Sequence, residues 1–222
     1  LEDFDQYQDI YFALSFLCKD KKYFNYMEQK VKEGKTVILD NSYNELRRPE
    51  EGKELVKIFQ NLKAKMLVSP DDNTWFAQEV YDVYKEIIQT VPKEKVLLVV
   101  KSQKEYDYFL SKGCSLFTTT YQQRPNLPIP IIMSSYHSLG LVNPHEIARY
   151  NPISCDTSMP IKLALRGFTI QDWACKGFPH FHTKDFPSFF HEKLTPEELN
   201  LAIENITALK EAINGSYSPR NL

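Results

Sequence analysis

The sequence predicts an α/β fold of the (β/α)8 barrel type, compact or irregular, with a C-terminal helix, because short apolar runs alternate with amphipathic stretches. The runs recur about every 25–30 residues, the spacing of strand–helix units in a parallel sheet. The run over 96–100 is apolar throughout, which is typical of a strand buried on both faces. About seven or eight such units fill the 222 residues, which favours a barrel, with a doubly wound sheet as the alternative.

In the N-terminal half, each apolar or β-branched run is followed by a helical pattern. The first helix ends at Gly34, a residue typical of helix C-termini. Pro49 suits the first position of the second helix, and the carboxylates of Glu50 and Glu51 suit its first turn. We therefore expect strands over 12–17, 36–40, 65–68 and 96–100, and helices over 19–33, 49–63, 74–91 and 103–112.

The C-terminal half continues the alternation, with one stretch that resists assignment. Thr195 and Glu198 have the spacing of a capping box, so a long final helix begins there. The stretch 168–194 has no clear pattern and is a candidate lid over the site, within a single domain over 1–222. We expect strands over 116–119, 129–133, 138–141 and 153–156, and helices near 143–150 and over 159–166 and 195–214.

Composition limits the classes of function. The 27 basic and 29 acidic residues nearly balance, which argues against a protein that coats nucleic acid. No apolar run of roughly 18 residues occurs, so neither a transmembrane helix nor a membrane partner is expected. The four cysteines are widely spaced, which fits reduced thiols in the cytoplasm. No glycine-rich phosphate-binding motif occurs, and no cofactor is expected.

Polar residues follow several of the predicted strands. In parallel α/β folds the chemistry lies at the carboxyl ends of the strands, so these side chains are expected on one rim. Aspartate after a strand is also a common turn or helix-capping residue, and this reading fits Asp72 best. The strand-end candidates are Asp40, Asp71 or Asp72, Lys101, His137 and Asp156.

Three histidines near the C-terminus raise the question of a metal site. His180 and His182 are two residues apart, with His191 further on. The segment is rich in Phe and Pro, and no cysteine or glutamate stands at a standard zinc spacing. An aromatic loop that packs on the barrel is the preferred interpretation, and no metal is expected.

Five segments resemble, in order, the tRNA-guanine transglycosylase superfamily. The resemblance is closest to the short phage and bacterial DNA 7-deazaguanine transglycosylase-like proteins that lack the zinc subdomain. It implies a (β/α)8 barrel that exchanges or cleaves a purine base at a glycosidic bond. The segments are 38–45, 68–72, 99–103, 137–146 and 153–160.

The resemblance also implies roles for particular residues. Asp156 corresponds to the nucleophile that attacks C1′ of the nucleotide, and Asp40 to the general acid/base. Retaining cleavage needs two such carboxylates on opposite sides of the anomeric carbon. The basic RNA-binding portion of the tRNA enzymes is missing, which favours DNA or a nucleotide as the partner over tRNA. The substrate-binding candidates are Asn41, Glu45, Asp71, Asp72, Lys101, Gln103, His137, Leu139 and Gly140.

Two other functions fit the same strand ends. Lys101 at the end of a barrel strand suits a lyase that forms a Schiff base, because an apolar pocket can activate a lysine amine. The third reading is a barrel that binds a nucleotide or base without catalysis, since a fold does not determine a function.

Overall fold

The computed structural model describes residues 2–8, 10–120, 136–140, 154–171 and 194–215, with Pro144, Ile147 and Pro152. The chain divides into two compact units. One unit is Asp9–Ser138, and the other combines Leu1–Gln8 with Leu139–Leu222. That residues 1–222 form a single domain stays a prediction.

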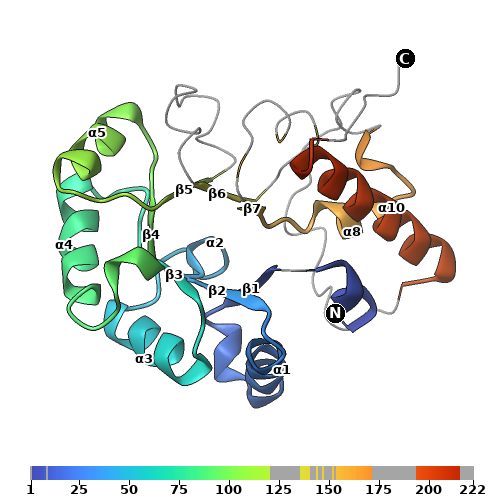
Figure 1. Ribbon diagram of the computed structural model, residues 1–222, viewed down its shortest axis with the longest axis horizontal. Helices are drawn as coiled ribbons and strands as arrows, with labels where there is room; N and C mark the ends of the chain where they lie inside the picture. The colour runs from blue at the N-terminus through green and yellow to red at the C-terminus, as the bar shows by residue number, and fades with distance from the viewer. Residues whose placement is uncertain are drawn as a thin grey trace. The chain divides into compact units, whose positions relative to one another are not determined.

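A parallel sheet organises the larger unit. Its strands lie side by side in chain order (Figure 1), and the four pairs from β1 to β5 are all parallel. A doubly wound sheet reverses its strand order at a switch point, whereas a barrel winds in one direction. The predicted α/β fold of the barrel type is therefore confirmed. The strands are β1 (Ile10–Leu14), β2 (Thr36–Asp40), β3 (Met66–Val68), β4 (Val96–Val99), β5 (Phe117–Thr120) and β6 (Tyr136–Leu139).

Helices connect the strands of this unit, and most lie where the sequence predicts them. The Asp20 carboxylate caps α1 by accepting from the backbone N–H of Tyr23 at 2.9 Å. The Ser102 hydroxyl caps α5 by accepting from the N–H of Glu105 at 3.3 Å. The helices are α1 (Lys21–Lys32), α2 (Tyr43–Leu46), α3 (Gly52–Leu62), α4 (Ala77–Ile87) and α5 (Gln103–Ser111), with short 3-10 helices at Leu17–Lys19 and Lys93–Lys95.

Some predicted boundaries are wrong. The first strand ends at Leu14 instead of continuing to residue 17, because the chain turns at Ser15 into a short 3-10 helix. Helix α4 begins after Phe76, not at residue 74, because the Asp72 carboxylate closes a turn with Thr74. The strand expected over 138–141 is β6, two residues earlier. The strand expected over 129–133, most of the helix near 143–150 and most of 168–194 lie outside the described residues.

The two faces of the sheet carry different sets of apolar side chains. Val37, Leu39 and Leu67 are completely buried on one face, and α1 packs against β1 and β2. The other face carries a cluster of Ile38, Val68, Leu97 and Val99, with partly buried neighbours. Side chains alternate between the two faces along a strand, so Asp40 lies on the same face as Ile38. By the same alternation, Lys101 continues the face that carries Val99. The backbone ladder continues as far as Val100, whose N–H donates to Thr118 at 2.9 Å.

The smaller unit packs the predicted C-terminal helix against a short one. Helix α10 (Pro196–Ile213) contacts α8 (Met159–Ala164), which follows the short strand β7 (Ser154–Cys155). The buried amide of Asn205 donates to the carbonyls of Pro160 at 3.0 Å and Phe168 at 3.2 Å, and accepts from the N–H of Ile170 at 2.6 Å. Within the part of the chain that the structure describes, no helix is long and apolar enough to cross a membrane.

Candidate active site

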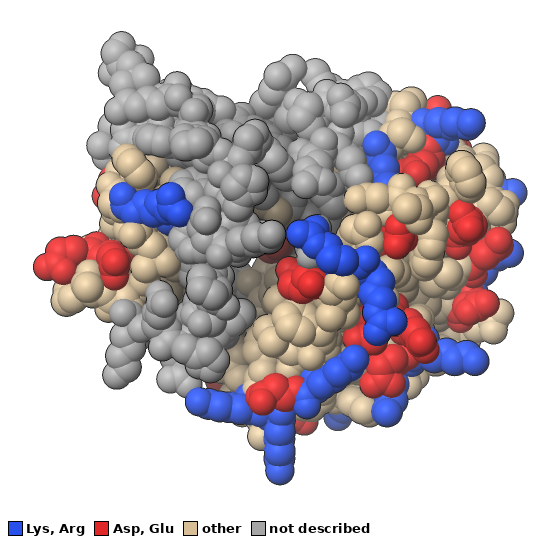
Figure 2. All heavy atoms as spheres, turned by 180° about the vertical axis from the view of Figure 1, so that it is seen from behind, with Lys and Arg blue, Asp and Glu red and all other residues tan. Residues whose placement is uncertain are grey.

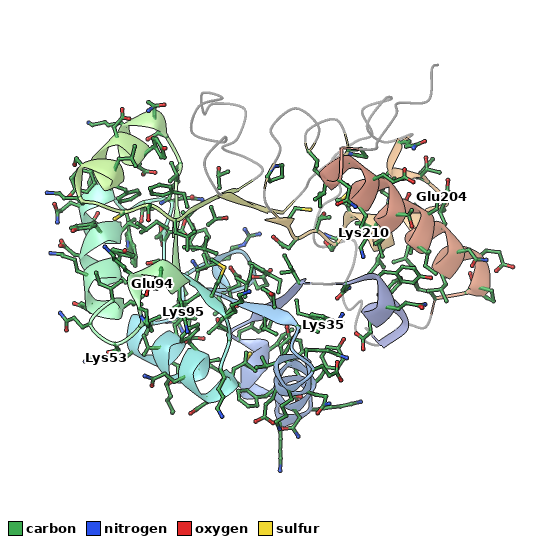
Figure 3. The ribbon with its side chains drawn as sticks, in the orientation of Figure 1. Lys35, Lys53, Glu94, Lys95, Glu204 and Lys210 are labelled. Carbon is green, nitrogen blue, oxygen red and sulfur yellow. The ribbon has the colours of Figure 1, made fainter. Side chains whose placement is uncertain are left out.

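Three polar side chains meet where β2, β3 and β4 end. Asn41 follows β2, Asp71 lies in the segment after β3, and Lys101 lies just beyond β4. The Asn41 amide nitrogen is 2.9 Å from Asp71 Oδ1, and Lys101 Nζ is 3.8 Å from Asp71 Oδ2. Of the strand-end residues predicted to share a rim, Asp71 and Lys101 lie together here, joined by Asn41 from the predicted binding residues. In Figure 3, Lys35 and Lys95 precede β2 and β4, and so mark the opposite end of these strands.

Asn41 links two strand ends by hydrogen bonds. The residue is 3% exposed. Its amide nitrogen donates to the Ser69 carbonyl at 2.8 Å as well as to Asp71. Its carbonyl oxygen accepts from the N–H of Tyr43 at 3.0 Å. The side chain therefore holds the end of β2 against the segment that follows β3.

Burial dominates the titration of Asp71. The residue is 6% exposed, and desolvation raises the pKa of its carboxyl above the usual value. The charge of Lys101 and the hydrogen bond from Asn41 act in the opposite direction. The negative charges of Glu105 and Asp72 raise the pKa further. Lys101 does not reverse the effect of burial, because 3.8 Å is too long for a hydrogen bond between Nζ and Oδ2.

Hydrogen bonds fix Lys101 through both its side-chain ammonium group and its backbone N–H. Its ammonium group donates to the backbone carbonyl of Asp72, and its backbone N–H donates to the Glu105 carboxylate at 2.7 Å. Its side chain is 11% exposed. Helix α5 begins two residues later, so the lysine stands at a rigid strand-to-helix junction. Glu105 was missed as a site residue, although its position three residues after Ser102 is the spacing of a capping box.

A second polar group lies at the ends of β1 and β2. Asp40 Oδ2 accepts from the N–H of Ser42 at 2.8 Å. Ser42 is completely buried and adopts left-handed backbone with φ 57°, and its hydroxyl accepts from the buried Ser15 hydroxyl at 2.9 Å. Burial raises the pKa of Tyr23, whose oxygen accepts from the N–H of Leu14. Ser15 was not predicted as a site residue, although it is the serine that interrupts the first apolar run of the sequence.

Other predicted binding residues have side-chain partners outside this cluster or are exposed. The Asp72 carboxylate accepts from the N–H and hydroxyl of Thr74, and these hydrogen bonds lower its pKa. Its predicted capping role is corrected to that of a turn, since α4 begins five residues later, at Ala77. The Gln103 amide donates to Asp107 at 2.6 Å on the exposed side of α5. Glu45 is exposed on α2.

The remaining candidates come later in the chain, His137 in the larger unit and the others in the smaller one. His137 and Leu139 belong to β6, and Gly140 follows with φ 84°. Asp156 is half-buried just after β7. His180, His182 and His191 fall outside the described residues, and within those residues no group of three or more metal-binding side chains occurs.

A hollow in the smaller unit offers fewer candidate catalytic side chains than the cluster of Asn41, Asp71 and Lys101. It has a volume of about 200 Å³ and lies between α10 and the segment before residue 172. Its carboxylates, Glu204 and Glu211, are exposed, and Figure 3 shows Glu204 on the outside of α10. We therefore place the candidate active site at Asn41, Asp71 and Lys101.

The described surface carries no large field of one charge on the face in Figure 2, where acidic and basic side chains are interspersed. A protein that binds the phosphate backbone of a nucleic acid needs a concentrated basic surface. This surface therefore does not support the expected nucleic-acid partner, DNA or tRNA.

Comparison with known proteins gives structural likeness at low sequence identity. No protein-family model matches the chain, and no curated protein matches it. A structure of CdNal from Clostridium difficile in complex with mannosamine is 12% identical, with a TM-score of 0.49 over 97% of this chain and 90% of that one. A structure of N-acetylneuraminate lyase from Mycoplasma synoviae is 10% identical, with a TM-score of 0.44 over 99% of this chain and 92% of that one.

These comparisons overturn the expected family. The similar structures include a lyase, not a tRNA-guanine transglycosylase, so the resemblance drawn from the sequence is wrong. The expected base exchange, the glycosyltransferase class and the modification of DNA with 7-deazaguanine are corrected with it. The physical reason is that an apolar run followed by Asp, Asn or Ser is ordinary strand-end turn chemistry. The nucleophile and acid/base roles expected of Asp156 and Asp40 lose their basis.

Proposed function

We propose that the chain is a lyase that forms a Schiff base between Lys101 and the carbonyl carbon of a small molecule, with Asp71 moving the protons. One observation carries the proposal. The amine of Lys101, a side chain that is 11% exposed, faces a buried carboxyl group of raised pKa at 3.8 Å, at the carboxyl ends of parallel strands. Such ends are where barrel folds place their chemistry.

The first step is proton transfer from the Lys101 ammonium to the Asp71 carboxylate. Burial favours the neutral carboxylic acid, so it favours this transfer. The neutral amine then attacks the carbonyl carbon and gives a carbinolamine, with the proton of the new C–N centre passing to the former carbonyl oxygen through Asp71. Departure of the hydroxyl group as water takes the proton from Asp71 and leaves an iminium ion and a carboxylate.

The second step breaks a carbon–carbon bond. The Asp71 carboxylate accepts the proton of a hydroxyl group on the carbon β to the iminium carbon. The bond between the α and β carbons breaks, its electron pair enters the iminium, and an aldehyde leaves. Asp71 then protonates the enamine carbon, and water hydrolyses the iminium to release the second product and the lysine amine.

Borohydride reduction tests the proposal directly. We expect propanal, acetone or pyruvate with borohydride to give a stable adduct that peptide mapping locates on Lys101, because reduction converts the iminium to a secondary amine. Lys101→Met and Lys101→Arg should lose the adduct, and the second variant keeps the positive charge. Lys104→Met removes an exposed lysine three residues away and should leave the adduct unchanged. A wild-type protein that gives no Lys101 adduct with any of the three probes contradicts the proposal.

A second candidate is a barrel that binds a nucleotide or another anionic small molecule without reaction. The observation in its favour is that the Lys101 ammonium already donates to the Asp72 carbonyl, as a charge in a binding site would. A small molecule that binds in the micromolar range, requires Lys101, and is recovered unchanged after long incubation would favour this reading.

We propose a cytoplasmic location on the chemistry of the cysteines. Cys18 and Cys114 are free thiols among the described residues. Cys18 and Cys114 are buried, and burial raises the pKa of Cys18 to about 12, which leaves it unreactive as a thiol. Free thiols suit a reducing compartment. Fractionation of cells followed by immunodetection checks the location.

A further inference from the structure

The orientation of the Asn41 amide follows from the polarity of two backbone groups. The N–H of Tyr43 is a donor, so the amide atom that it contacts at 3.0 Å must be the oxygen. The carbonyl of Ser69 is an acceptor, so the amide atom 2.8 Å from it must be the nitrogen. Exchange of the two amide atoms would break both contacts. The amide of this 3% exposed residue is therefore fixed in one orientation.

This orientation determines which oxygen of Asp71 carries a proton. The second N–H of the Asn41 amide donates to Asp71 Oδ1 at 2.9 Å, so Oδ1 is an acceptor. A proton on the carboxyl group must then lie on Oδ2. Oδ2 is the atom that faces Lys101 Nζ at 3.8 Å. The amide thus directs the only exchangeable proton of the carboxyl group toward the amine.

We infer that Asn41 is the positioning residue of this site, which holds the Asp71 carboxyl group so that its proton is exchanged at Oδ2 with Lys101. The inference rests on the proposed function for its catalytic meaning, whereas the hydrogen-bond geometry stands independently of it. Asn41 does not touch the reacting atoms and acts through Asp71.

The charges around Asp71 come from three elements. Lys101, just beyond β4, is the positive charge that faces the carboxyl group. The negative charges are Glu105 on α5 and Asp72, which follows Asp71 in the segment after β3. Asn41, after β2, supplies a neutral donor. Loss of that donor leaves burial and two like charges opposed by Lys101 alone, so the carboxyl group should hold its proton to higher pH.

Carboxyl titration of Asp71 by ¹³C NMR tests the inference, with Asp71→Asn assigning the signal. Asn41→Leu keeps a similar volume without donor or acceptor, and we expect it to raise the Asp71 pKa. Asn41→Asp keeps the acceptor for Tyr43 and adds a like charge, so it should raise the Asp71 pKa as well. The second variant decides the matter if the first does not fold. Asn61→Ala removes an exposed amide from α3 and should leave the titration unchanged.

The borohydride reaction supplies the catalytic readout. We expect the acid limb of the rate of adduct formation to move to higher pH in both Asn41 variants, with a maximal rate about 10- to 100-fold lower, as for a lost hydrogen bond to a charged group. An unchanged Asp71 titration in a folded Asn41 variant overturns the inference. Absence of any adduct in the wild-type protein overturns the proposed function instead, and the NMR titration still decides the role of Asn41.

Discussion

At the scale of single residues, the burial of the Asp71 carboxyl group costs free energy whenever the group is charged. A buried carboxylate loses its hydration, and only close partners offset the cost. Asn41 provides one hydrogen bond, and Lys101 provides a charge at 3.8 Å. These two partners are weaker than burial, and the raised pKa of Asp71 is the result. The residue is therefore poised to exchange protons and is costly for stability at neutral pH.

Stability should fall as pH rises through the titration of Asp71. The folded-state pKa lies above the ordinary aspartate value of 3.8, so the folded protein keeps its proton at pH values where the unfolded chain has lost it. The free energy of unfolding then decreases with rising pH above the unfolded value, by at most about 1.4 kcal/mol per pH unit for this one group. Urea unfolding of the wild type and of Asp71→Asn, from pH 4 upward, measures the difference.

We expect Asp71→Asn to lack this contribution and to gain stability relative to the wild type as pH rises. Asp82→Asn is the matched control, since hydrogen bonds lower the pKa of this exposed carboxyl on α4. A stability difference between wild type and Asp71→Asn that does not change with pH would contradict the raised pKa.

At the scale of elements, left-handed residues end or begin several helices. Lys63 ends α3 with φ 57° on the surface, and Ser42 precedes α2 with the same φ in the interior. Residues other than glycine pay roughly 1 kcal/mol for this conformation. The two positions differ because the Ser42 hydroxyl is hydrogen-bonded to Ser15 and the exposed Lys63 side chain has no buried contact to lose.

The same substitution should therefore have opposite effects at the two positions. We expect Lys63→Gly to raise the free energy of unfolding by about 0.5–1 kcal/mol, since glycine relieves the strain. Ser42→Gly should lower it by about 1 kcal/mol or more, because the buried Ser15 hydroxyl loses its partner. Chemical denaturation of both variants checks the signs. Destabilisation by Lys63→Gly would show that its side chain has a contact of its own.

Elements were easier to predict than contacts between them. The runs at β2 and β4 appear in the sequence because burial on two faces demands continuous apolar residues. Lys101 and Asp71 were predicted to converge because strand ends share a rim. Gln103 was predicted to join them, but the first residue of a helix has no fixed direction, and its amide pairs with Asp107.

The orientation of the Asn41 side-chain amide could not be predicted from the sequence. Its partner Asp71 is 30 residues away, so the contact depends on the register of β2 and β3. Strand-end Asp, Asn and Ser also misled the choice of family, because they satisfy turns in any parallel fold. The chemistry of such residues becomes visible only when their partners are known.

At the scale of the whole molecule, each compact unit has its own buried apolar cluster. In the larger unit, Ile38, Val68, Leu97 and Val99 pack on one face of the sheet. In the smaller unit, Met159, Leu163, Ile170 and Leu209 are among the residues that pack around α10. The chemistry proposed above draws only on the larger unit.

The buried amide of Asn205 has a consequence for the smaller unit. It satisfies three backbone groups, one at Pro160 in the first turn of α8 and two after that helix, at Phe168 and Ile170. Detachment of α10 would leave all three groups without that partner, so the helix should leave in one cooperative step. The amide hydrogen of Ile170 would then exchange with deuterium no faster than α10 detaches. The exchange rate of this single amide would therefore report the local opening of the C-terminal part of the chain.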